Sequence, residues 1–254
     1  MKILFSTLLI FLLMSCGGGE MHRSPAPGFG FTNGIMRINE DSVEYKMYKA
    51  LHIDDKEEQY KKVEELLKAG ANPDKCYGQI KWVDTNPLWN YCGDYNLAKL
   101  LISYGADVKK RPYVASLLSY QVMPDKNPRK EWVEFYKNNP DMQYMTESHA
   151  YKCCETLLEA GADPNMKATF GEAVLFPASD WNYNRYFKKY GKTAINFCIR
   201  KNLLTIFSLL IKYGARLDED SLQFAKETTE HTGSSEMEEL VLAQWQIQIQ
   251  GEKK

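Results

Sequence analysis

One short phrase occurs four times in this chain and restricts its possible folds more than any other feature. Each copy has two leucines, two or three further residues and then Gly-Ala; the copies lie at 66–74, 100–108, 157–165 and 209–218. Paired leucines fit the apolar face of a helix, and glycine readily adopts the left-handed conformation that follows a last helical turn. Asn, Asp and Pro after each glycine favour a turn. The sequence therefore predicts four helices that end at Gly70, Gly105, Gly161 and Gly214.

This phrase resembles the end of an ankyrin repeat, whose opening reads T-P-L-H-x-A. The cleanest opening is Gly191–Cys198, with 23 residues from Gly191 to Gly214. Asn86-Pro87-Leu88-Trp89 stands at the corresponding place in the second copy. In the first copy the corresponding place is occupied by Ala50-Leu51-His52. The third copy has its opening near 115–118. The resemblance gives His52 a structural role, in which its ring bridges neighbouring turns, and no catalytic one.

The resemblance implies an all-α solenoid of helix-turn-helix units, because each helix pair buries its apolar face only by stacking on its neighbours. The stop glycines are 35, 56 and 53 residues apart, against a family period of about 33. Two insertions of about 20 residues are therefore expected, near 121–145 and 168–189. We expect about four repeats and a C-terminal cap with a polar outer face, built from helices near 221–225 and 236–246, over residues 43–250. Residues 251–254 form a tail.

The N-terminal sequence is typical of a secretory leader. Residues 1–15 combine Lys2 with an apolar run from Ile3 to Met14 that is too short to span a bilayer. Leu13-Met14-Ser15-Cys16 resembles a bacterial lipobox, which implies cleavage before Cys16 and attachment of lipid to it. Residues 16–42 then form the lipidated N-terminus and a Gly-rich tether. The alternative is an ordinary leader that merely precedes a cysteine.

Catalytic and metal-binding motifs are not found. The sequence has no H-E-x-x-H, C-x-x-C or G-x-S-x-G, and its four histidines are widely separated. The formal charge of −1 gives no field that would recruit nucleic acid. We therefore expect no enzyme activity, no metal, no cofactor, no small-molecule substrate and no nucleic-acid partner.

Five cysteines remain besides Cys16, an odd number that cannot all pair within one chain. Cys153, Cys154 and Cys198 fall inside predicted helices, where a small buried side chain is wanted. Packing is therefore the expected role, and a Cys154–Cys198 disulfide stays as the less favoured alternative.

Ankyrin arrays bind proteins through loop tips and the first helix of each pair, which together form a concave face. The corresponding stretches here are rich in aromatic residues, which often dominate the binding energy at interfaces. The alternative is that these aromatics cover the insertions themselves. The expected partner-binding residues are Trp82, Trp89, Tyr91, Tyr113, Trp132, Tyr136, Trp181, Tyr183 and Tyr186.

These observations predict a membrane-anchored lipoprotein that binds another protein in the bacterial cell envelope. A sharper version, which rests on analogy alone, is an immunity protein that neutralises a periplasmic toxin. The alternative is an envelope scaffold or assembly factor with several partners. In some bacterial lipoproteins an aspartate after the lipidated cysteine is associated with retention in the inner membrane. Gly17 stands at that place here, so the resemblance to lipoproteins implies the outer membrane facing the periplasm, while the cell surface and the inner membrane stay open.

Overall fold

The computed structural model describes residues 41–77, 84–119, 122–128, 130–138, 144–168 and 192–252. These residues are mainly helical, which confirms the all-α class. By its contacts the chain divides into two compact units, one up to Asn90 and one from Tyr91. Each unit is described by itself.

The first unit contains two packed helices, a short hairpin and the start of a third helix. Its elements are α2 (Val43–Leu51), α3 (Lys56–Lys68), β1 (Cys76–Tyr77), β2 (Asp84–Thr85) and α4 (Pro87–Tyr91). Met47 and Leu51 of α2 are buried, as are Val63 and Leu67 of α3. Strand β1 pairs antiparallel with β2, and α2 packs against β1.

His52 does not open a helix, so its predicted place in the repeat is wrong. It follows the last residue of α2, where its Nδ1 is 2.8 Å from the Tyr48 carbonyl oxygen. The reason lies in the next helix. Asp55 accepts a hydrogen bond from the Glu58 N–H at 2.8 Å and starts α3 at Lys56. Helix α3 thus has 13 residues, against nine in the helix Leu204–Lys212, and α2 lies correspondingly earlier in the chain.

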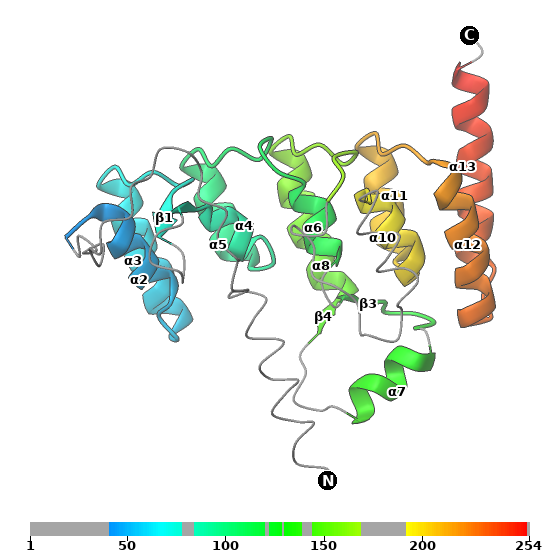
Figure 1. Ribbon diagram of the computed structural model, residues 1–254, viewed down its shortest axis with the longest axis horizontal. Helices are drawn as coiled ribbons and strands as arrows, with labels where there is room; N and C mark the ends of the chain where they lie inside the picture. Colours follow the sequence, from blue (N-terminus) through cyan, green and yellow to red (C-terminus); the bar gives the residue numbers. More distant parts are fainter. Residues whose placement is uncertain are drawn as a thin grey trace, which may run out of the picture. The chain divides into compact units, whose positions relative to one another are not determined.

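The second unit consists of helix pairs stacked side by side (Figure 1). Its helices are α5 (Tyr95–Ser103), α6 (Tyr113–Ser119), α7 (Lys130–Asn138), α8 (Glu147–Glu159), α10 (Ala194–Lys201), α11 (Leu204–Lys212), α12 (Glu219–Thr232) and α13 (Glu236–Glu252). Helices α6, α10 and α12 form one row, and α5, α8 and α11 form the other. The rows are joined where α6 packs on α8 and α10 on α11, while α13 packs on α12. Two-residue strands β3 (Val122–Met123) and β4 (Met145–Thr146) pair in parallel.

All four predicted stop glycines are left-handed, which confirms the interpretation of the repeated phrase. Their φ angles are +93° at Gly70, +91° at Gly105, +94° at Gly161 and +84° at Gly214. In each case the N–H of the alanine after the glycine donates to the carbonyl of the leucine four residues before the glycine, at 2.9 to 3.0 Å. This bond satisfies a carbonyl that the end of the helix leaves without a partner.

The turns after three of these helices are held by their own polar side chains, as the sequence predicted. Asn72 Oδ1 accepts the N–H of Asp74 at 2.8 Å, and Asp163 Oδ1 accepts that of Asn165 at the same distance. Asp107 accepts the N–H of Lys109 at 3.0 Å. Such turns replace one helical hydrogen bond by a local one and so direct the chain away from the helix axis.

The observed first residues of the helices agree with the predicted ones to different degrees. Pro87 begins α4 and Thr193 precedes α10, as expected. Helix α6 starts at Tyr113, so residues 115–118 lie within it. The helices predicted near 221–225 and 236–246 are α12 and α13, and α13 continues to Glu252. The insertion near 168–189 lies almost wholly outside the described residues.

Candidate functional site

The predicted contact residues are spread over very different environments. Trp89 and Tyr91 lie half-buried in α4, and Tyr136 lies half-buried in α7. Trp132 also belongs to α7, but its side chain is outside the described part of the structure. Apart from Tyr113, the other predicted site residues fall outside the described residues: Cys16, Trp82, Trp181, Tyr183 and Tyr186.

The prediction that Tyr113 contacts a partner is wrong, because Tyr113 is fully buried and belongs to the core. It begins α6, in which every residue from Tyr113 to Ser119 is buried. The same holds for every residue of α10. These two first helices of their pairs therefore offer no exposed face, contrary to the expectation for a concave binding surface. The sequence signal that misled was the aromatic residue beside a basic turn.

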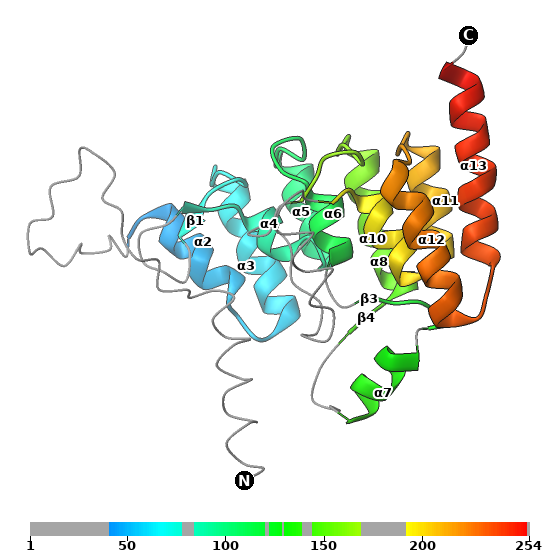
Figure 2. The same cartoon turned by 45° about the vertical axis from the view of Figure 1, so that its right-hand side comes forward.

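Helix α7 is the part of the predicted contact region that does reach the surface. It lies between β3 and β4, apart from the stacked pairs, and makes no extensive contact with any other described helix or strand (Figure 2). Val133 of α7 is 45% exposed, and Tyr144, which follows it in the chain, is 50% exposed. Exposed large apolar side chains grouped on one segment are typical of protein interaction sites.

The rings of Tyr136 and Tyr144 pack on each other and give this surface a defined shape. Their centroids are 4.9 Å apart and the rings are tilted by 55°. Burial raises the pKa of Tyr136 to about 12, and the neighbouring Tyr144 adds to the effect. The Tyr136 phenol is therefore a neutral hydrogen-bond donor at physiological pH. Tyrosine pairs of this kind supply a large contact area with few rotatable bonds.

The base of this segment is fixed by a buried carboxylate. Glu147, at the start of α8, accepts hydrogen bonds from the Thr205 N–H at 2.9 Å and from Thr205 Oγ1 at 2.7 Å. It also accepts from the Asp125 N–H at 3.1 Å. Leu203, which precedes α11, has no side chain able to cap that helix. Glu147 supplies the missing negative charge at the α11 N-terminus, where the helix dipole favours an anion.

Further bonds hold residues 122–128 against the stacked pairs. Ser148 Oγ donates to Asp125 Oδ2 at 2.6 Å, and Asn202 Nδ2 donates to the Asn127 carbonyl at 3.2 Å. Asn127 and Asn202 both have left-handed backbones, with φ of +48° and +60°. Helix α7 is thus presented from a firmly attached base. Sequence reasoning missed Glu147, because a glutamate in a first helical turn gives no sign that it will be buried.

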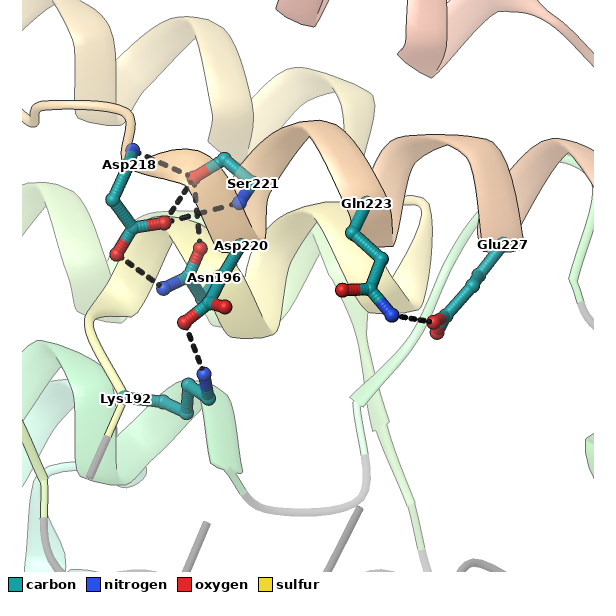
Figure 3. A network of polar contacts seen from close by, with 7 residues as sticks. All are labelled: Lys192, Asn196, Asp218, Asp220, Ser221, Gln223 and Glu227. Atoms are coloured by element: carbon teal, nitrogen blue, oxygen red, sulfur yellow. Dashed lines mark hydrogen bonds and ion pairs between the residues drawn. The ribbon is translucent and has the colours of Figure 1, made fainter. Parts of the chain in front are cut away.

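A second polar cluster joins α10 to α12 (Figure 3). Lys192 Nζ is 2.6 Å from Asp220 Oδ2, and Asn196 Nδ2 donates to Asp218 Oδ2 at 3.1 Å. Ser221 Oγ lies 2.9 Å from Asn196 Oδ1. Burial lowers the pKa of Lys192, although Asp220 opposes this. The groups satisfy one another in acid–base and amide pairs, so the cluster fixes the two helices together rather than forming a reactive centre.

A separate polar group, with Gln223 and Glu227, lies further along α12. Gln223 Nε2 donates to Glu227 Oε1 at 2.9 Å (Figure 3). Glu227 Oε2 also accepts from Arg200 at 2.8 Å. The Arg200 guanidinium also lies 5.5 Å from the Phe224 ring centroid. Asn196, Asp218 and Ser221 thus form one group of polar contacts, and Gln223, Glu227 and Arg200 form another.

The described thiols pack in the interior of the second unit. Cys92, Cys153, Cys154 and Cys198 are free and buried, so no disulfide joins Cys154 to Cys198 and the packing interpretation is confirmed. Burial raises the pKa of Cys92 and that of Cys153 to about 12. Thiols with such pKa values are poor nucleophiles at neutral pH. Among the described residues, no group of His, Cys, Asp and Glu side chains is arranged to hold a metal ion.

Comparison with known proteins gives no further assignment. The chain matches no protein-family model, and a search of curated proteins finds none with significant sequence similarity. No helix in the described ranges has the length and apolar character required to cross a membrane.

Proposed function

We propose that this chain is a bacterial lipoprotein of the ankyrin-repeat type that binds a protein partner in the cell envelope through α7 and the residues beside it. The observation that carries the proposal is the exposed surface of Val133 and Tyr144 on a segment that stands apart from the stacked pairs. Repeat arrays commonly carry their binding residues on insertions that leave the stacked core intact.

The repeat assignment is supported by three features that recur in phase. Each copy of the phrase ends a helix, each glycine is left-handed, and each following alanine donates back to a leucine carbonyl. The paired helices of the second unit stack in two rows, which is the arrangement the ankyrin resemblance implies.

The membrane attachment is supported by the sequence Leu13-Met14-Ser15-Cys16 and the apolar leader before it. Lipid on Cys16 would hold the repeats at a membrane surface, with the outer membrane facing the periplasm as the first choice. Within this proposal an immunity protein has one tightly bound partner, whereas a scaffold has several weak ones.

The test is crosslinking and capture of the full-length chain from its own cells, compared between matched variants. Val133→Glu and Tyr144→Ala should each reduce capture of one saturable partner at least tenfold, because each removes apolar contact at the centre of the surface. Tyr60→Ala is the control, since Tyr60 is also an exposed tyrosine but lies on α3. Equal capture by all variants would contradict the proposed site, and many weak partners would favour a scaffold.

A further inference from the structure

The chain enters and leaves the segment that carries α7 at one place, because β3 and β4 pair with each other. Val122 pairs with Met145, and Met123 pairs with Thr146. Glu147 follows directly after β4, so its carboxylate lies where the two ends of the segment meet. Helix α7 itself makes no extensive contact with any other described helix or strand. Its position therefore depends on how these two ends are held.

The two oxygens of the Glu147 carboxylate bind different parts of the second unit. Oε1 accepts from the Thr205 N–H at 2.9 Å and from Thr205 Oγ1 at 2.7 Å, at the N-terminus of α11. Oε2 accepts from the Asp125 N–H at 3.1 Å, just before α7 begins at Lys130. The carboxylate makes all of these bonds at once because both of its oxygens are acceptors.

The attachments before and after α7 differ in kind. After α7 the contact is apolar, since the Tyr136 ring packs on Tyr144, the residue that precedes β4. Before α7 the attachments are hydrogen bonds of Asp125 and Asn127. The Glu147 bond is the one among them that ties the start of the segment to the residue at its end. A hydrogen bond to a carboxylate is also stronger than one between neutral groups.

Glutamine in place of Glu147 can serve only one of the two parts, because its amide has one acceptor oxygen and an NH2 group that only donates. With the NH2 group toward Thr205, it would face the Thr205 N–H at the α11 N-terminus, donor against donor. The helix dipole there favours the oxygen. The oxygen therefore stays on Thr205 and the NH2 group faces the Asp125 N–H. Glu147→Gln thus releases Asp125 and leaves α11 capped.

We propose that Glu147 is a positioning residue for partner binding, which through its Oε2 bond to Asp125 sets the place at which Val133 and Tyr144 are presented. This inference rests on the function proposed for α7. A binding segment that is already held in place has less freedom to lose on binding than a loose one. Loss of the Oε2 bond should therefore weaken partner binding about tenfold, although no group is removed from the contact surface.

The first test needs no partner and measures the position of α7 by pulsed electron paramagnetic resonance. Spin labels are placed on the full-length lipidated chain at Lys137→Cys in α7 and Glu230→Cys in α12, both exposed positions, in a Cys76→Ser background. Glu147→Gln should broaden the distribution of distances between the two labels. Thr205→Val is the matched control, because it removes a hydrogen bond to Oε1 and leaves the Oε2 bond to Asp125 in place. An unchanged distribution in Glu147→Gln, or equal broadening in both variants, would overturn the proposal.

The second test repeats the crosslinking and capture experiment with the same two substitutions, after circular dichroism has shown that each variant is folded. Glu147→Gln should reduce capture about tenfold, and Thr205→Val should capture as the wild type does. If Val133→Glu lost capture and Glu147→Gln did not, the positioning role would be overturned and the proposed function would stand. If neither lost capture although the label distances broadened, the proposed binding site would be wrong, while the control of α7 by Glu147 would be upheld.

Discussion

Replacing Gly214 by alanine should lower the free energy of unfolding by about 0.5–1.5 kcal/mol. The backbone φ there is +84°, and a Cβ would meet no atom within 4 Å, so the cost is conformational rather than steric. A left-handed conformation costs an L-residue about 1–2 kcal/mol. Alanine recovers about 0.4–1 kcal/mol by restricting the unfolded chain. The midpoints of these two ranges differ by about 0.8 kcal/mol, which is the central value of the expected loss.

Gly251 provides the matched control, because it also has nothing within 4 Å but lies in helix α13 without a positive φ. Alanine favours a helix over glycine by up to about 1 kcal/mol, and less near a helix end. Gly251→Ala should therefore be neutral or slightly stabilising. The same chemical change thus has opposite expected signs at two positions in one unit.

The assay is urea unfolding followed by circular dichroism, with wild type, Gly214→Ala, Gly214→Asn and Gly251→Ala compared. Asparagine tolerates the left-handed region better than alanine, so Gly214→Asn should lose less stability. If Gly214→Ala unfolded at the wild-type urea concentration, the stop glycines would not be required by backbone geometry. The physical basis of the repeat assignment would then be refuted.

Three further predictions concern buried groups. Glu147→Gln should lower the free energy of unfolding by about 1.5–3 kcal/mol, because an amide cannot accept all three of the hydrogen bonds that the carboxylate accepts. An unchanged urea concentration at the unfolding midpoint would contradict this. Burial holds the pKa of Lys201 well below 10.5, so the unfolded chain binds more protons between the two pKa values and stability should rise with pH in that range. Lys201→Met should reduce this increase of the unfolding free energy with pH. The same pH dependence in the variant and the wild type would contradict the prediction. Alkylation mapped by mass spectrometry at pH 8 should label the four buried thiols only after urea is added, and labelling in the folded chain would show that they are accessible.

The features predicted correctly from the sequence are those decided within a few residues. A left-handed stop needs only glycine after a leucine-rich turn, and Pro87 at the first position of α4 needs only a fixed φ and no N–H. The turns after the helices likewise depend on an Asn or Asp and the residue two positions later. Local rules of this kind need no knowledge of the tertiary structure.

The features missed depend on contacts between distant segments. Tyr113 looked like a surface aromatic, yet α6 is enclosed by α8 and α10 and the ring belongs to the core. Glu147 caps a helix that begins more than 50 residues later, so no local pattern reveals it. His52 was misplaced because the cap at Asp55 lengthened α3, and the family spacing does not include that choice.

The burial of α10 bears directly on where the proposed binding site can lie. The polar residues of α10 suggest an exposed face, but Asn196 bonds to Asp218 and Arg200 bonds to Glu227. Lys192, just before the helix, bonds to Asp220. A group whose hydrogen bonds are already made inside the protein gains little from a partner and would leave a buried mate unsatisfied if drawn outward. The inner helices therefore contribute rigidity, and the proposed binding site lies on a segment whose apolar side chains are exposed. In the second unit, the described segment of α7 with Tyr144 meets that condition.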